Sequence, residues 1–198
     1  MKKLIYLLLI FSLAGLAVGC GNKKDEEYFE TTLSFEKDGK ISDVIVESFS
    51  EEYYSEDGLK AYFQEKISEY NSTNIGNENV VLKDLKVENG RATASMEFDS
   101  SDAYTAFYGT PVFYGTVSDA YDKGYISETV LKKVGSSETI SKVELMKMRD
   151  ATIIVVNEVV AVNSPKKIDY VSANVEVIED KKARVSSDST GTAYLLLK

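Results

Sequence analysis

The chain has 198 residues, with 23 Lys or Arg against 32 Asp or Glu and a formal charge of −9 at pH 7. It contains no His and no Trp, and its one cysteine is Cys20. These absences exclude Ser-His and Cys-His dyads and most zinc sites, and the acidic charge disfavours nucleic acid, which is bound by clustered Lys and Arg.

The N-terminal segment predicts export and lipid attachment. Met1-Lys2-Lys3 precedes an apolar run over residues 4–18, which ends at Gly19-Cys20. This run of about 15 residues is shorter than the ~20 that a membrane-spanning helix needs. The segment Leu16-Ala17-Val18-Gly19-Cys20 resembles the lipobox of bacterial lipoproteins, although Ala17 stands where that motif usually has Leu. An ordinary signal peptide and a short membrane anchor are the alternatives.

The lipobox resemblance implies that Cys20 carries a diacylglyceryl-type anchor and that residues 1–19 are removed as a signal peptide. Removal would leave 179 residues and, with the loss of Lys2 and Lys3 and no acid, a formal charge of −11. We expect residues 20–30 to be the lipidated cysteine and a short tether of about 17 Å, and residues 31–198 to form a single domain. The acyl chains would then be the contact with the membrane, since so acidic a surface disfavours anionic lipid head groups.

The first half of the domain predicts two hairpins, each followed by a helix. Strands over 33–35 and 41–46 flank Asp38-Gly39, and strands from Val81 to Val87 and from Ala92 to Phe98 flank Asn89-Gly90. Asp-Gly and Asn-Gly favour tight two-residue turns. Ser55 is expected to cap a helix that runs to Tyr70, and a second short helix is expected to run from Ser100 to Phe107.

The second half predicts mostly strands. We expect short helices over 118–123, ended by Gly124, and over 141–148, opened by the capping-box spacing Ser141-x-x-Glu144. The apolar run 151–156 predicts a strand covered on both faces, and Asn157-Glu158 is expected to turn it into a strand over 159–162. Further strands are expected over 167–171, 175–178, 183–186 and 192–197. The predicted class is α+β: mainly antiparallel sheet built from hairpins, with a few short helices packed on it.

Aromatic residues are densest between positions 104 and 125. The tyrosines of this segment are the candidate ligand-binding residues: Tyr104, Tyr108, Tyr114, Tyr121 and Tyr125. Their rings could stack on a sugar or a peptide, with the interleaved Gly109, Gly115 and Gly124 letting the ligand approach the backbone. The alternative is that short helices bury these rings against a sheet.

No catalytic residue, metal ligand or cofactor is predicted. Ser164-Pro165-Lys166-Lys167 has the Ser-x-x-Lys spacing of penicillin-recognising enzymes, but it lies between predicted strands and lacks the partner motifs, so a turn is expected. The acidic neighbours Glu51-Glu52, Asp99 with Asp102, and Glu179-Asp180 lack the spacing of a calcium loop and are interpreted as solvated.

Several segments together resemble a family of small, functionally uncharacterised lipoproteins of Gram-positive, mostly anaerobic bacteria. The resemblance lies in 35–40 (Phe-Glu-Lys-Asp-Gly-Lys), 49–54, 67–71, 113–117 and 167–178, and so covers most of the chain after the signal. It implies a location on the outer face of the cytoplasmic membrane and supplies no catalytic residues. We therefore expect a lipid-anchored, non-enzymatic binding domain with a cell-envelope protein or glycan as its partner. A glycan-acting enzyme that uses carboxylates and an accessory solute-binding protein are the alternatives.

Overall fold

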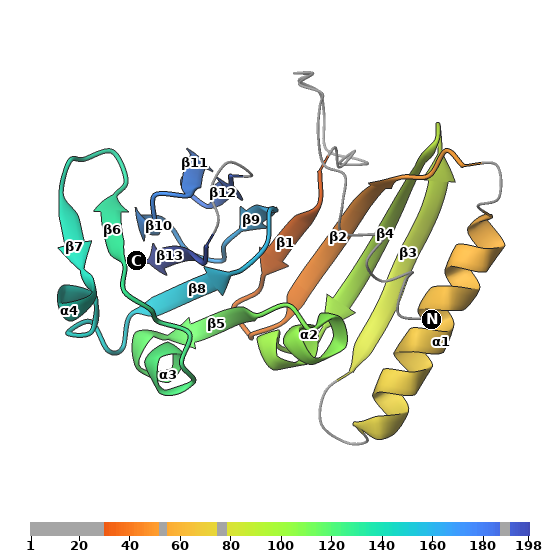
Figure 1. Ribbon diagram of the computed structural model, residues 1–198, viewed down its shortest axis with the longest axis horizontal. Helices are drawn as coiled ribbons and strands as arrows, with labels where there is room; N and C mark the ends of the chain where they lie inside the picture. Colours follow the sequence, from red (N-terminus) through yellow and green to blue (C-terminus); the bar gives the residue numbers. More distant parts are fainter. Residues whose placement is uncertain (1–29, 52–54, 75–78, 187–190) are drawn as a thin grey trace.

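The structure is a computed structural model that describes residues 30–51, 55–74, 79–186 and 191–198. Cys20 and nearly all of the predicted tether lie outside the described residues. The described chain forms two β-sheets and four helices (Figure 1). Every strand pair is antiparallel except β1 with β9, so the predicted α+β class with mainly antiparallel sheet is confirmed.

The first sheet has seven strands in the order β11-β12-β9-β1-β2-β4-β3. Their bounds are β1 Thr32–Phe35, β2 Ile41–Ser48, β3 Val80–Glu88, β4 Arg91–Phe98, β9 Ala161–Asn163, β11 Val175–Glu179 and β12 Lys182–Val185. Both predicted hairpins are present in it. At the β3–β4 turn Asn89 and Gly90 both have positive φ, at 53° and 72°, as a two-residue turn with this twist requires.

The β1–β2 turn differs from the prediction. Asp38 is not in the positive-φ region, whereas Gly39 is, at 96°. The Gly39 amide donates to the Glu36 carbonyl at 3.1 Å and the Glu36 amide to the Lys40 carbonyl at 2.9 Å. The loop therefore has three residues, the turn-plus-bulge arrangement that needs one residue with positive φ rather than two.

The second sheet has six strands in the order β5-β8-β13-β10-β6-β7. Their bounds are β5 Val112–Thr116, β6 Val130–Lys133, β7 Thr139–Ser141, β8 Thr152–Val156, β10 Ile168–Val171 and β13 Ala193–Leu197. The sequence analysis placed β8, β10 and β13 within a residue or two of these bounds, but it did not predict β5, β6 or β7.

Strand β8 is buried on both faces, as predicted. Ile154 and Val156 belong to one apolar cluster, and Ile153 and Val155 to another on the opposite face. The expected turn at Asn157-Glu158 does not make a hairpin, however. Strand β8 pairs with β5 and β13, whereas β9 pairs with β1 and β12, so residues 157–160 carry the chain from one sheet to the other.

The helices are α1 Glu56–Thr73, α2 Ser101–Tyr108, α3 Val117–Asp122 and α4 Lys142–Leu145. Ser55 and Ser100 cap α1 and α2 as predicted, and the capping box of Ser141 with Glu144 is present. Helix α1 continues three residues beyond Tyr70, and α4 stops three residues before Met148. Helix α1 lies along β3 at one end of the molecule, and α2 lies between β4 and β5 (Figure 1).

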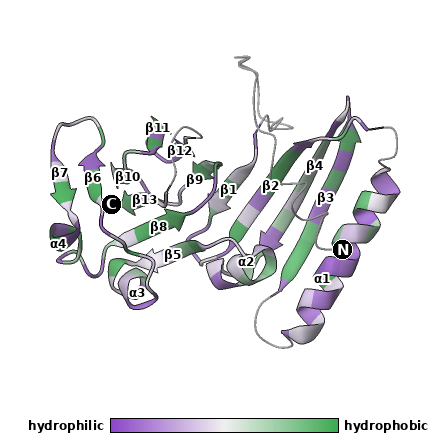
Figure 2. Cartoon of the chain, viewed as in Figure 1, coloured by the Kyte–Doolittle hydropathy of each residue, from purple (hydrophilic) through white to green (hydrophobic). Residues whose placement is uncertain are grey.

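The larger apolar cluster joins the two sheets. Leu33 and Ile41 of the first sheet and Leu195 of the second belong to it, together with Phe63 of α1. The smaller cluster lies on the other face of the second sheet, where Val117 and Ala120 of α3 pack. Strand β8 is accordingly mostly hydrophobic in Figure 2, whereas α1 alternates hydrophilic and hydrophobic bands.

The first described residue is already fixed to the domain. Glu30 accepts two hydrogen bonds from the Arg184 guanidinium of β12, at 2.8 Å from Nε and 2.7 Å from Nη2. Glu30, the last residue of the predicted tether, is thus bound to the domain.

Candidate functional site

The structure separates the five candidate tyrosines. Tyr104 and Tyr108 lie together on α2, with ring centroids 4.8 Å apart, and both contact Phe98 of β4. Tyr114 packs on Phe35 of β1, at 5.8 Å. Tyr125 stacks on Phe113 at 5.2 Å on the other face of the second sheet, and Tyr121 is 50% exposed. The rings therefore do not form one shared platform, and only Tyr125 lines a pocket described below.

The interleaved glycines have local structural roles. Gly109 and Gly124 have φ of 74° and 78° next to the C-terminal ends of α2 and α3, a backbone conformation that residues other than glycine rarely adopt. A Cβ at Gly115 would lie 2.7 Å from Cζ of Phe113, so the ring position requires a glycine there. Each glycine is explained by the fold without a ligand.

Asp43 is the most deeply buried acidic residue that the structure describes, at 2% exposure. It lies in β2, opposite Leu33 of β1 and Met96 of β4, on the face of the sheet that carries the core residues Ile41 and Ile45. Its Oδ1 atom is buried and has no hydrogen-bond partner among the described residues. An uncompensated oxygen of this kind is costly to bury, particularly when the carboxyl is charged.

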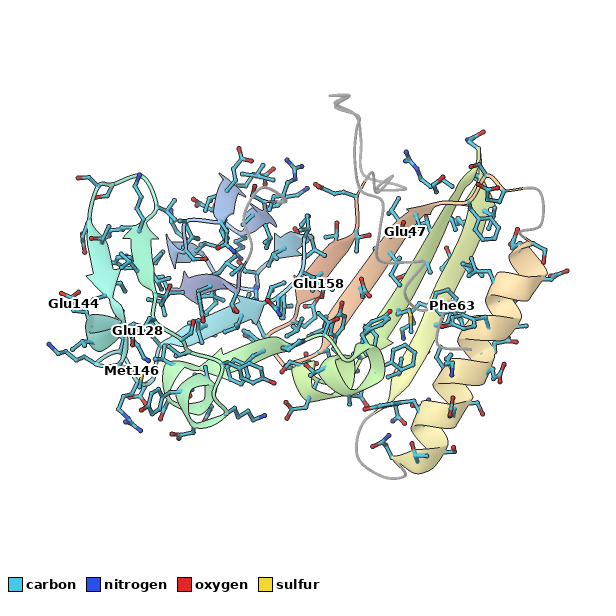
Figure 3. All side chains as sticks on the ribbon, viewed as in Figure 1. Glu47, Phe63, Glu128, Glu144, Met146 and Glu158 are labelled. Atoms are coloured by element: carbon cyan, nitrogen blue, oxygen red, sulfur yellow. The ribbon has the colours of Figure 1, made fainter. Side chains whose placement is uncertain are left out.

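Three side chains from other elements surround Asp43. The Tyr104 hydroxyl of α2 donates to Oε1 of Glu158 at 2.8 Å. The Tyr108 hydroxyl interacts with the Asp43 carboxyl and contacts Sδ of Met96 at 3.1 Å. Glu158, in the 157–160 connection between the sheets, lies near the centre of the molecule in Figure 3. We call Asp43, Glu158, Tyr104 and Tyr108 the carboxyl–tyrosine cluster.

Burial dominates the protonation of this cluster. It is the main cause that raises the pKa of Asp43, the negative charge of Glu158 adds to the rise, and the Tyr108 hydroxyl opposes it, so that the pKa is about 8. Burial also raises the pKa of Glu158, against the hydrogen bond from Tyr104. Both tyrosines have a pKa well above the usual 10, first because they are buried and then because Asp43 is near. At neutral pH Asp43 is therefore mainly protonated.

Neither carboxyl group was predicted from the sequence. Asp43 had a detectable signal, because in the strand 41–46 it alternates with Ile41 and Ile45, which places an acid on the apolar face. Glu158 had none, since it lies in a connection whose path between the sheets the sequence did not reveal. Among the acids that were considered, Asp102 forms an ion pair with Lys123 at 2.6 Å and Asp180 with Lys167 at 2.9 Å, whereas Glu52 lies outside the described residues.

The Ser164 motif is a turn, as predicted. Its hydroxyl donates to the Lys166 carbonyl at 2.6 Å and approaches the Lys181 carbonyl at 3.2 Å. A hydroxyl held by main-chain carbonyls in a turn between strands is not arranged as a nucleophile beside a lysine base.

A pocket of about 320 Å³ lies at the end of β8 and is lined in part by Asn157, the residue before Glu158. Its wall combines the apolar surfaces of Pro111, Tyr125 and Val155 with Lys123, Gly124, Asn157 and Thr192. The volume is at the lower end of the range for small-molecule sites. The Lys123 ammonium bonds both carboxylate oxygens of Asp102, at 2.6 and 2.9 Å.

Tyr194 holds one wall of this pocket in place. Its hydroxyl, on β13, donates to the Tyr125 carbonyl at 3.0 Å and accepts from the Ser127 amide at 3.2 Å. The Tyr125 ring is fixed in turn by stacking on Phe113. A wall held in this way loses little freedom when a ligand binds, which favours affinity.

Comparisons with protein-family models, with curated proteins and with solved structures find no match for the chain. In the part of the chain that the structure describes, each helix is too short or too polar to cross a membrane.

Proposed function

We propose that this chain is a lipid-anchored domain at the outer face of the cytoplasmic membrane, where it binds a cell-envelope component without catalysing a reaction. The observation that carries the proposal is the apolar run that ends at Gly19-Cys20 after Met1-Lys2-Lys3. A diacylglyceryl group supplies two acyl chains, enough for stable anchoring, whereas a single chain holds only weakly.

The position of the domain supports the anchoring proposal. Cys20 precedes Glu30, the first described residue, by 10 positions, and Glu30 is bound to Arg184 of the domain. If these ten residues act as the expected tether, they would span about 17 Å. The domain would thus be kept close to the bilayer, within reach of envelope components or of the external parts of membrane proteins.

The anchor is tested by changing the cysteine. Cys20→Ala should release the protein from membranes into the medium and abolish labelling with a fatty-acid analogue. Cys20→Ser is a matched control, since it keeps a side chain of similar size but removes the thiol that is acylated. Labelling that persists in either variant would contradict lipid attachment at this residue.

The pocket at the end of β8 is the proposed ligand site. It brings together one aromatic ring, a side-chain amide, a hydroxyl and an ammonium group, on Tyr125, Asn157, Thr192 and Lys123. Rings that stack and polar groups that donate hydrogen bonds are what a sugar unit needs. We therefore expect the ligand to be a polar sugar unit of an envelope glycan.

Binding is tested by calorimetry with purified disaccharide fragments of cell-wall glycan. Asn157→Ala removes one neutral hydrogen bond of about 1 kcal/mol, and so should weaken binding about fivefold. Tyr121→Ala is the control, because Tyr121 lies in the same segment but is exposed and outside the pocket. Equal affinities of both variants and the wild type would show that the pocket is not the site.

A glycan-acting enzyme is the second candidate, and the pairing of the buried Asp43 with the partly buried Glu158 favours it. Two neighbouring carboxyls, one of them Asp43 with its pKa raised to about 8, resemble the protonated acid and its partner carboxylate in glycoside hydrolysis. Asp43 is 2% exposed, so a substrate could reach it only if the elements packed around it moved. Hydrolysis of cell-wall glycan that is lost in both Asp43→Asn and Glu158→Gln would support the enzyme and contradict the binding domain.

A further inference from the structure

The carboxyl–tyrosine cluster joins three parts of the molecule that are separate in sequence. Asp43 belongs to the first sheet, Tyr104 and Tyr108 to α2, and Glu158 to the connection that crosses between the sheets. Helix α2 is also bound to the second sheet, where the Thr105 hydroxyl exchanges hydrogen bonds of 3.1 Å with the backbone of Val112. The cluster therefore lies where α2 meets both sheets.

The ionisable groups that act on the cluster are all acids. The groups that act on Asp43 are Glu158 and Tyr108, and those that act on Tyr104 and Tyr108 add Tyr62 of α1. Its neighbours on β1 and β4 are Leu33 and Met96, which carry no charge. No lysine or arginine is among these described groups, so a negative charge on Asp43 would be uncompensated.

We propose that the carboxyl–tyrosine cluster is a proton-dependent clamp, which holds α2 and the 157–158 connection together while Asp43 is protonated and loosens them when it ionises. A protonated Asp43 places no second charge beside Glu158. An ionised one would have Glu158 as a like-charged neighbour and an unpartnered buried Oδ1. Displacement of α2, which carries Tyr104 and Tyr108, would let water reach that oxygen.

The clamp would also control the pocket. Asn157, which lines the pocket, directly precedes Glu158, and Pro111, which also lines it, follows the end of α2 by three residues. Loosening of α2 and of the connection would therefore move both of these lining residues. This consequence rests on the proposed function, because it assumes that the pocket is the ligand site.

Hydrogen exchange of the α2 amides tests the clamp without any ligand, and so can fail independently of ligand binding. If opening exposes Asp43, each pH unit between about 5 and 8 makes opening about tenfold more favourable, and the effect levels off above pH 8. Protection factors of α2, corrected for intrinsic exchange, should fall accordingly and lie below those of β13. Protection that does not change with pH, or that matches β13 throughout, would overturn the proposal.

Asp43→Asn should remove this pH dependence, since the amide does not ionise. Glu47→Gln is the matched control: Glu47 lies on the same strand, is half-buried, has its pKa raised by burial, and lies away from α2 in Figure 3. It should leave the tenfold dependence intact. A loss of the dependence in Glu47→Gln, or its persistence in a folded Asp43→Asn, would overturn the assignment to Asp43.

A second measurement covers the case in which Asp43→Asn does not fold. The wild type should show the infrared band of a protonated carboxyl at pH 7, which disappears on titration to higher pH. Glu158→Gln removes the neighbouring charge, so the midpoint of this titration should shift to lower pH. An unshifted midpoint, or no protonated band at pH 7, would contradict the clamp.

Discussion

Tyr194 and Asp43 are both almost completely buried, at 2% exposure each, but their polar atoms differ in how many hydrogen-bond partners they have. The Tyr194 hydroxyl has three partners, the Tyr125 carbonyl and the amide and hydroxyl of Ser127. Asp43 has an unpartnered oxygen and an acidic neighbour, Glu158. A neutral group whose hydrogen bonds are all made stabilises one structure at every pH. An ionisable group that lacks a hydrogen-bond partner makes the stability of the structure depend on pH.

The largest expected effect is the pH dependence that Asp43 causes. Its pKa is about 8 in the folded protein and about 3.9 in an unfolded chain, so folding binds a proton between these values. Stability should therefore fall as the pH rises from 5 to 8, by on the order of 1 kcal/mol per pH unit. Urea unfolding followed by circular dichroism at several pH values measures this slope, and a flat or rising profile would contradict it.

Tyr194→Phe sharpens the comparison because it removes a hydroxyl that does not depend on pH. The Tyr125 carbonyl and the Ser127 amide would each lose a partner, at a cost of roughly 1–3 kcal/mol. The loss should be the same at pH 5 and at pH 7.5, in contrast to the change that Asp43→Asn produces. A loss that varies with pH would show that Tyr194 belongs to the titrating network.

Features that depend on neighbouring residues could be predicted from the sequence, whereas those that depend on distant contacts could not. Hairpins and caps depend on neighbouring residues, and so Asn89-Gly90, Ser100 and the Ser141–Glu144 capping box were predicted correctly. The crossing at 157–160 and the pairing of β1 with β9 depend on contacts between residues more than 100 positions apart. The pattern of the sequence carries no record of those contacts, since apolar alternation shows that a strand is buried but not which sheet it joins.

The residues of the candidate sites also divide into those that local sequence predicts and those that only the fold brings together. Tyr125 was predicted as a binding residue from local aromatic density, and it does line the pocket. Its companions Asn157 and Thr192 come from distant segments that the fold brings together. Asp43 could have been found from its register with Ile41 and Ile45, but that signal becomes meaningful only when the second sheet and α2 are known to cover this face.

Ser100→Ala tests whether α2 is held by its cap as well as by the cluster. The Ser100 side chain accepts from the Ala103 amide at 3.0 Å, and its loss should cost about 1 kcal/mol. Protection of the α2 amides should then fall about fivefold at every pH, parallel to the wild-type profile. Ser141→Ala is the matched control, because it removes the cap of α4 at the other end of the molecule and should leave α2 exchange unchanged.

The smallest expected effect comes from the exposed ion pair of Asp102 with Lys123. The two side chains are 54% and 44% exposed, so Asp102→Asn should lower the free energy of unfolding by less than about 1 kcal/mol. Because salt screens exposed charges, this loss should disappear in concentrated sodium chloride. The pH dependence caused by Asp43 should persist in the same salt, since its charge develops in a part of the core that ions do not enter. Unfolding measured at low and high salt therefore separates the two acids, and a pH slope that vanished with salt would place the titrating group at the surface rather than beneath α2.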